Sequence, residues 1–185
     1  WDSLDALSSH TSNGGAMSVV ECNNVYINNS LITHCFRGIR VQDCTIGLIQ
    51  NNHVYKILDN GIYLAIGPFL GCKNINVKSN IIEGVGHHGL LCIRGYDNIF
   101  DNNTIIKSWA TVFNSYYTRN VTIVNNNGVG CNWKSFNGYG IDGEHLAQIY
   151  ITKSYPMTNN VDYLANIQNN NFIECGSGQH SVVEM

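Results

Sequence analysis

The sequence has few charged residues and almost no proline. Only 12% of its 185 residues are Asp, Glu, Lys or Arg, about half the usual share, and 2 Pro stand against 18 Gly. The formal net charge of −3 argues against a nucleic-acid partner, whose binding depends on Lys and Arg neutralising phosphates. The chain has no apolar run of about 18 residues that would cross a bilayer, so no membrane insertion is expected.

Close cysteine pairs are also missing. The 7 cysteines are an odd number and none forms a Cys-x-x-Cys pair, which gives little support to a disulfide framework or a zinc site. The acids Asp43, Asp97 and Asp101 are scattered and do not form a calcium motif. We therefore expect neither a metal nor another cofactor, and we interpret the cysteines as small core residues of a protein assembled in a reducing cytoplasm.

What the sequence does contain is a repeat of about 22 residues. Each copy has an apolar pair, an Asn-Asn step or a close variant of it, a second apolar pair and then small residues. Aligned on the second polar residue, the copies fall 22, 28, 23, 23 and 44 residues apart, at Ser30, Asn52, Asn80, Asn103, Asn126 and Asn170. Such a period accommodates three short strands and three turns, which is one rung of a parallel β-helix.

The repeat predicts an all-β, single-stranded parallel β-helix of about six rungs. Asn tolerates the left-handed conformation of a sharp turn, and its amide can bond to the Asn above and below, so the aligned residues should stack as a ladder at one corner. Residues 1–15 lack the repeat and form a lead-in or cap, and residues 16–185 form the β-helix domain. Cys22, Cys44 and Cys72 recur in phase, as do Cys35 and Cys175, so both columns should face inward.

Two segments depart from the shortest rung. We place insertions near residues 65–71 and 128–163, and solenoid insertions commonly sit on the binding face. A Gly or Thr followed by an apolar residue marks the start of each rung, and on this pattern the long last rung opens at Gly140-Ile141. The other openings are Gly38-Ile39, Gly61-Ile62, Gly89-Leu90 and Thr111-Val112.

The repeat, the Asn ladder and the stacked columns over about residues 16–176 resemble the right-handed parallel β-helix families. These are pectate-lyase-like and polygalacturonase-like enzymes and the tailspikes of bacteriophages. The resemblance implies a polysaccharide ligand lying along the outward face of the first sheet. Tailspikes are homotrimers of the virion tail that bind, and commonly cleave, the surface polysaccharide of a host bacterium, which implies a virion or extracellular location.

Alternation after each opening residue predicts which side chains face outward on that sheet. The predicted row is Arg40, Tyr63, Leu91, Phe113 and Asp142. Of these, Arg40, Tyr63 and Phe113 are candidates for binding sugar, because aromatic rings stack on sugars and Arg pairs with a uronate carboxylate. The alternative is that the same row forms the interface of a trimer.

Candidate catalytic residues come from the segment GYGIDGEHL. Asp142 and Glu144 are two apart, so in a strand they would share a face and could serve as the paired carboxylates of a glycoside hydrolase, with His145 beside them. Trp133 and Tyr139 are near enough in sequence to bind sugar. The alternative is that both acids are solvated residues of a loop.

A second motif supplies another candidate. Gly86-His87-His88-Gly89 resembles the Gly-His-Gly motif of polygalacturonases, and Leu58-Asp59-Asn60-Gly61 is similar to their Asn-Thr-Asp-Gly motif. His88 is accordingly a candidate for substrate binding. The family's Asp-Asp rung and Arg-Ile-Lys motif are absent, so its catalytic roles are not transferred.

Three functions are compatible with these features. The first is tailspike-like recognition of a bacterial surface polysaccharide by a homotrimer, with depolymerisation as a further hypothesis. The second is a non-catalytic receptor-binding or structural fibre segment, and the third a monomeric polysaccharide lyase or hydrolase. Two insertions on one side favour a binding face over a simple spacer.

Overall fold

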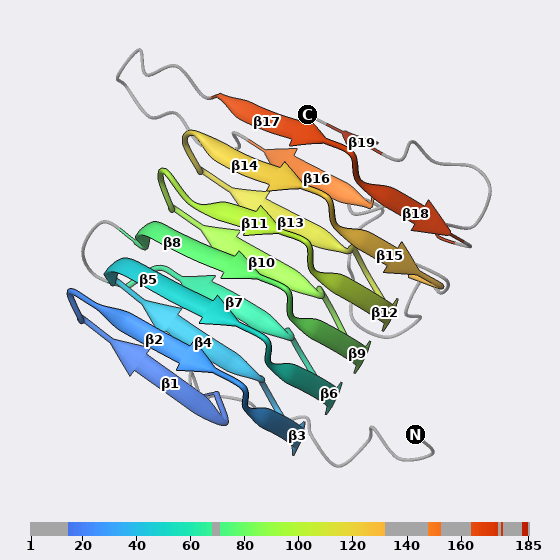
Figure 1. Ribbon diagram of the computed structural model, residues 1–185, viewed down its shortest axis with the longest axis horizontal. Helices are drawn as coiled ribbons and strands as arrows, with labels where there is room; N and C mark the ends of the chain where they lie inside the picture. Colours follow the sequence, from blue (N-terminus) through green and yellow to red (C-terminus); the bar gives the residue numbers. More distant parts are fainter. Residues whose placement is uncertain are drawn as a thin grey trace.

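A computed structural model describes residues 15–67, 71–131, 148–152, 164–173, 175 and 183–184. All regular elements in these ranges are β-strands, and the chain visits three parallel sheets in turn (Figure 1). The first sheet contains β1 (Met17–Val20), β4 (Ile39–Gln42), β7 (Ile62–Ala65), β10 (Leu90–Ile93), β13 (Phe113–Tyr116), β16 (Ile149–Thr152) and β19 (Val183–Glu184).

The other two sheets are built in the same way. The second sheet contains β2 (Val25–Asn28), β5 (Thr45–Gln50), β8 (Lys73–Lys78), β11 (Ile99–Asp101), β14 (Val121–Val124) and β17 (Ala165–Gln168). The third contains β3 (Leu31–Cys35), β6 (His53–Ile57), β9 (Ile81–Val85), β12 (Thr104–Ser108), β15 (Asn127–Val129) and β18 (Asn171–Ile173). Each strand pairs with the strand three further along, so β1 to β18 form six three-stranded rungs, and the predicted β-helix is confirmed.

The core is a stack of apolar columns enclosed by the three sheets. Along the first sheet, Ile39, Ile62, Leu90, Phe113 and Ile149 lie in register, and all are fully buried. No single rung could bury these side chains, because each is covered by the rungs above and below. Cysteines belong to these columns, as predicted: all seven are free thiols and four of them are buried.

The asparagine ladder is present at the corner between the second and third sheets. The Nδ2 atom of Asn52 donates to Oδ1 of Asn80 at 2.9 Å, and the same bond links Asn80 to Asn103, Asn103 to Asn126 and Asn126 to Asn170. The ladder prediction is confirmed, with one correction. The left-handed conformation belongs to the residue before each ladder position: Asn29, Asn51, Ser79, Asn102, Asn125 and Asn169.

The fifth rung opens one residue later than predicted. Phe113 pairs with Leu90, so Val112, not Thr111, stands where the earlier rungs have Gly38, Gly61 and Gly89. A Cβ on Gly89 would lie 2.6 Å from Cγ2 of Ile105, whereas a Cβ on Gly128 would lie 2.5 Å from Cγ2 of Val112. In the fourth rung the small residue, Gly89, opens the rung and the large one, Ile105, lies on β12. In the fifth rung the large residue, Val112, opens the rung and the small one, Gly128, lies on β15, so the side chain fills the same space from the opposite strand.

The sixth rung also opens elsewhere. The strand that pairs with β13 is β16, so the first sheet continues at Ile149. The predicted second insertion thus contains a strand of the first sheet, and the predicted opening at Gly140-Ile141 lies outside the described residues. The expected outward position of Asp142 is occupied by Tyr150, which pairs with Asn114.

The segment between β7 and β8 holds the first predicted insertion. The carboxylate of Asp43 accepts hydrogen bonds from the amides of Gly67 and Gly71, at 3.2 and 2.8 Å. These bonds fasten both ends of the insertion to the rung beneath, at the connection from the first sheet to the second.

Candidate functional site

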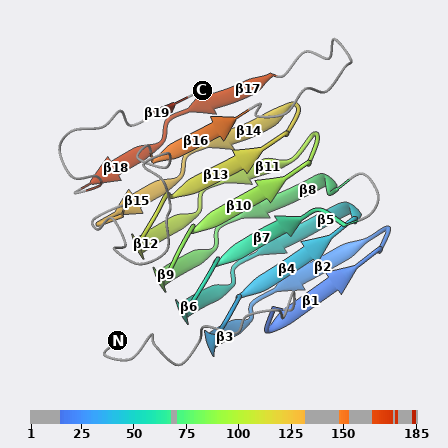
Figure 2. The same ribbon diagram turned by 180° about the vertical axis from the view of Figure 1, so that it is seen from behind.

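The outer face of the first sheet carries a row of large polar and aromatic side chains. Strand register places Arg40, Tyr63, Leu91, Asn114 and Tyr150 side by side on β4, β7, β10, β13 and β16, whose stacking is seen from the other side in Figure 2. The prediction was right for Arg40, Tyr63 and Leu91. It was wrong for Phe113, which is fully buried and packs edge-on against Phe100 with ring centroids 4.7 Å apart. The one-residue shift at Val112 is the reason.

Arg40 is a half-buried arginine at the first of these positions. One of its terminal nitrogens donates to Oε1 of Gln42, while its Nε is buried with no hydrogen-bond partner among the described residues. No ion pair to Arg40 occurs within that part of the chain either. A half-buried guanidinium that lies beside an aromatic ring and has no ion-pair partner among the described residues is suited to a planar anion such as a carboxylate.

Tyr63 lies between two arginines. The Cζ atom of Arg37 is 5.5 Å from the centroid of its ring. Burial raises the pKa of the Tyr63 phenol above its usual value, although Arg37 and Arg40 act in the opposite direction. The phenol therefore stays protonated at neutral pH and can donate or accept a hydrogen bond.

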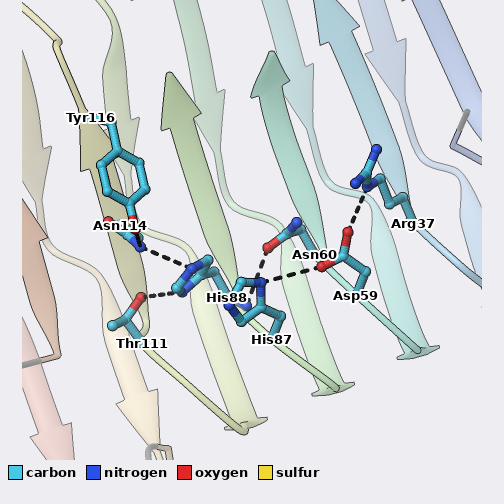
Figure 3. Close-up of polar contacts among 8 residues, drawn as sticks. All are labelled: Arg37, Asp59, Asn60, His87, His88, Thr111, Asn114 and Tyr116. Carbon is cyan, nitrogen blue, oxygen red and sulfur yellow. Dashed lines mark hydrogen bonds and ion pairs between the residues drawn. The ribbon is translucent and has the colours of Figure 1, made fainter. Parts of the chain in front are cut away.

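Beside this row, the corner between the third and first sheets holds an ion-pair cluster (Figure 3). Arg37 Nε donates to Oδ2 of Asp59 at 2.6 Å, and Nδ1 of His87 lies 3.2 Å from Oδ1 of the same carboxylate. Burial alone would raise the pKa of Asp59, but the hydrogen bonds and charges of His87 and Arg37 outweigh burial and hold that pKa below its usual range. Asp59 is therefore an ionised carboxylate with a partner at each oxygen.

A second, buried set of hydrogen bonds continues the cluster toward β13. His88 Nδ1 lies 2.9 Å from Oγ1 of Thr111, and Nδ2 of Asn114 lies 2.9 Å from Nε2 of His88 and donates to the Tyr116 hydroxyl at 3.1 Å (Figure 3). With the Asn114 amide donating, His88 carries its proton on Nδ1. His88 is only 1% exposed, so its predicted direct contact with substrate is wrong; it supports the residues above it.

The two rings of the His87-His88 pair connect these sets. Their centroids are 3.7 Å apart, and His87 is the one that reaches solvent, with 29% of its side chain exposed. From Arg37, at the end of the first rung, to Tyr116 in the fifth, the cluster thus spans five rungs.

Five predicted residues lie outside the described ranges. Asp142, Glu144 and His145, with Trp133 and Tyr139, belong to residues 132–147. The carboxylate-pair hypothesis therefore stays a prediction.

The sequence reasoning missed several residues of this cluster. Arg37, Thr111, Asn114 and Tyr116 were given no role, and neither were Asp59 and His87, although both were noted. One signal was available: the residue just before each opening position is polar and changes from rung to rung, as Arg37, Asn60, His88 and Thr111.

The described residues contain no group of three or more His, Cys, Asp or Glu side chains that could hold a metal ion. Asp97 and Asp101 instead accept hydrogen bonds from Asn120 and Asn125, each at 2.9 Å. In the same part of the chain there is no helix long and apolar enough to span a membrane.

Comparison with known protein families agrees with this architecture. A family model described as the right-handed beta helix region matches residues 5–128. Among solved structures, an alginate lyase from Paenibacillus sp. str. FPU-7 superposes with a TM-score of 0.48 and 11% sequence identity, over 90% of this chain and 78% of that one. A comparison with curated protein sequences gave no match.

Proposed function

Because the chain belongs to the right-handed β-helix family, we propose that it is a tailspike-like domain that binds an acidic bacterial surface polysaccharide along its first sheet. The observation that carries the proposal is Arg40, a half-buried arginine with no ion-pair partner among the described residues, beside Tyr63. A uronate sugar offers what these two residues can bind, since its carboxylate pairs with a guanidinium and its ring stacks on an aromatic face.

The shape of the row suits a chain-like ligand. Neighbouring parallel strands are about 4.8 Å apart, so the five outward positions from Arg40 to Tyr150 extend over about 19 Å. Tyr116 and Tyr150 add a second aromatic pair at the far end, with ring centroids 6.4 Å apart. Leu91 and Asn114 in the middle of the row are buried, so its contacts to sugar come from Arg40 and Tyr63 at one end and from Tyr150 at the other.

The same row is a poor candidate for a trimer interface. Leu91 is 5% exposed and Asn114 is fully buried within one chain, so association would cover little more of either side chain. A homotrimer on a virion tail is nevertheless part of the proposal, with contacts through another face. Sedimentation of the purified domain should give a mass three times that of the chain. A monomer at high concentration would contradict the trimer proposal.

Binding is tested with an array of uronate-containing and neutral bacterial polysaccharides, followed by calorimetry on the polymers retained. Arg40→Ala and Tyr63→Ala are expected to weaken binding about tenfold or more, which is the loss of about one charge-assisted contact. The control is Tyr26→Ala, because Tyr26 is 67% exposed on β2 of the second sheet. Equal losses in all three variants, or binding to neutral polymers alone, would contradict the proposal.

Cleavage by the predicted carboxylates is a separate question. If the domain is a hydrolase that uses Asp142 and Glu144, then Asp142→Asn and Glu144→Gln each abolish release of reducing ends and leave binding intact. Full cleavage in both variants would assign the chemistry to other residues.

A further inference from the structure

Two cysteines lie opposite each other on neighbouring rungs near one end of the stack. Cys131 follows β15 in the fifth rung and Cys175 follows β18 in the sixth, and these two strands pair in register (Figure 1). Just beyond the strands, the backbone amide of Cys131 donates to Sγ of Cys175 at 3.4 Å. Adjacent parallel strands are about 4.8 Å apart, which is within the Cα separation of about 4.4–6.8 Å that a disulfide spans.

The two thiols differ in exposure. Cys131 is fully buried, whereas Cys175 is half-buried. An oxidant in solvent can therefore reach Cys175, while Cys131 can react only with a sulfur that already lies beside it. This is the arrangement of an accessible thiol next to a resolving thiol.

Hydrogen bonds to the Cys131 sulfur favour its ionisation. The Cys175 thiol donates to this sulfur, and that bond, against the effect of burial, lowers the pKa of Cys131 to about 7 and raises the pKa of Cys175. Ser108 faces the same sulfur from the fourth rung and lowers the pKa of Cys131 further, and its buried hydroxyl has no other partner among the described residues. The pair therefore loses one proton near neutral pH, and the thiolate is the form that exchanges with disulfides.

The opposite end of the stack holds a pair with the same backbone contact and different chemistry. The amide of Cys22 donates to Sγ of Cys44 at 3.3 Å, and here too one cysteine is half-buried and the other fully buried. The Cys44 thiol donates to the carbonyl of Gln42 at 3.1 Å, and burial raises its pKa. Because Cys44 keeps its proton, this second pair should exchange far more slowly.

We propose that Cys131 and Cys175 form a disulfide that joins the fifth rung to the sixth when the protein leaves a reducing environment, with a small-molecule disulfide as the oxidant. Transfer of a proton along the hydrogen bond makes Cys175 the thiolate, which attacks one sulfur of the oxidant and releases the other half as a thiolate. The Cys131 sulfur loses its proton and attacks the Cys175 sulfur of this mixed disulfide, and the second small thiolate leaves. Two protein thiols are thus oxidised, the small disulfide is reduced to two thiols, and these take up the two protons.

The bond would strengthen the part of the stack with the fewest backbone contacts. In the described part of the chain, β17 and β18 are the outermost strands of their sheets, and each pairs on one side alone. A terminal rung opens more readily than the rungs inside a stack. The two cysteines are 44 residues apart, so the crosslink would also restrict a long loop of the unfolded chain.

The test uses the full 185-residue chain, purified with a reductant and moved at pH 7 into glutathione buffers of increasing disulfide-to-thiol ratio. After an acid quench and alkylation of free thiols, mass spectrometry of peptides identifies the linked cysteines. We expect two of the seven thiols to be lost, in one peptide pair that contains Cys131 and Cys175. The oxidised protein should melt about 10 °C above the reduced protein.

Serine variants separate the two steps of the reaction. Cys131→Ser should stop at a mixed disulfide of glutathione with Cys175, whereas Cys175→Ser should leave Cys131 reduced, because a fully buried thiol meets no oxidant. Neither variant should melt higher after oxidation, and the melting transition of each reduced variant shows that it is folded. The matched control, Cys22→Ser, should form the Cys131–Cys175 bond at the rate of the wild type.

Ser108→Ala tests the hydroxyl that faces the Cys131 sulfur. The variant loses a hydrogen bond to a charged group, so disulfide formation at pH 7 should slow about tenfold. The difference should disappear at about pH 10, where the thiol ionises without this bond. A purely structural role of Ser108 would instead slow the reaction equally at both pH values.

The outcomes are independent of the binding proposal, because none of these measurements uses a polysaccharide. If all seven thiols stay free in the most oxidising buffer, the inference is overturned. Linked peptides that contain another pair, such as Cys22 with Cys44, in place of Cys131 with Cys175 would overturn it too. A Cys131→Ser variant that forms no mixed disulfide at Cys175 would contradict the order of the two steps.

Discussion

Two corners of the same rung differ in how they use polar residues. At the corner between the second and third sheets, five consecutive rungs carry the same residue, from Asn52 to Asn170, in the same hydrogen bonds. At the corner between the third and first sheets, the residue before each opening position changes on every rung. It is Arg37, then Asn60, His88 and Thr111.

The corner with the asparagine ladder, here called the uniform corner, and the corner with Arg37, Asp59 and His87, here called the varied corner, have different roles. A residue that only joins rungs is suited equally well to every rung, so an identical side chain can repeat. Arg37, Asp59 and His87 form a cluster only because they differ, one a cation, one an anion and one a base. The uniform corner accordingly stabilises the stack, and the varied corner holds an ion-pair cluster beside the proposed binding row.

Breaking the uniform corner should have the largest effect on stability. Asn103 is fully buried and accepts from both the backbone and the side-chain amide of Asn80, at 3.1 and 2.9 Å. Asn103→Ala leaves these donors unpaired, and at about 1–3 kcal/mol for each buried group we expect a loss of about 4 kcal/mol in the free energy of unfolding. Urea unfolding measures it, with Thr122→Ala on the outer face of β14 as the control. A loss below about 1 kcal/mol would show that the ladder is dispensable.

Enlarging Gly89, the small residue that opens the fourth rung, should give the next largest loss in the free energy of unfolding. Gly89→Val inserts a side chain against Ile105, whose Cγ2 and Cγ1 atoms would lie 2.6 and 2.9 Å from the new Cβ, and should cost about 3 kcal/mol. Gly89→Val with Ile105→Gly recreates the arrangement that Val112 and Gly128 already have. The double variant should therefore be more stable than the sum of the two single losses predicts, by about 1–3 kcal/mol. Additive losses would mean that the two positions do not share the space.

The contribution of the varied corner to the free energy of unfolding should depend on pH. Because the folded-state pKa of Asp59 is below the unfolded value of about 3.9, its ion pairs stabilise the fold above that pH, and this stability is lost as pH falls through the folded pKa. Asp59→Asn should cost about 2 kcal/mol at pH 7, as for a hydrogen bond to a charged group, and the difference from wild type should shrink below about pH 4. Unfolding curves at pH 7 and pH 3 measure this. A difference independent of pH would show that the charge of Asp59 is not what matters.

The parts of the molecule that could be predicted from the sequence are those in which one residue type recurs at a fixed position of each rung or strand. An Asn at a fixed step reveals the ladder, and apolar alternation reveals the strands around Arg40 and Tyr63. The exchange between Val112 and Gly128 could not be predicted in this way, because it is a contact between two strands of one rung. It moved Phe113 from the outer face into the core.

The candidate site was harder to predict for the same reason. Arg37, Asp59 and His87 come from three successive rungs, 22 and 28 residues apart, so no local motif contains them. The strand β16 was missed because Gln148 stands before it, where a glycine was expected, while Gly140-Ile141 had the expected form. A column compared across rungs is a better guide to such a site than a motif within one rung.

The smallest effect should come from the outer side of the uniform corner. Asn125 Nδ2 donates to Oδ1 of Asp101 at 2.9 Å, within 0.1 Å of the side-chain bonds of the ladder, but this pair is exposed. Water can replace either partner, so Asp101→Ala should change the free energy of unfolding by less than about 0.5 kcal/mol. Paired with Asn103→Ala in one urea series, the variant separates burial from hydrogen-bond geometry as the source of stability. If the two variants lost similar amounts of stability, the hydrogen bond itself would stabilise the stack, and burial of the ladder would add nothing to its contribution.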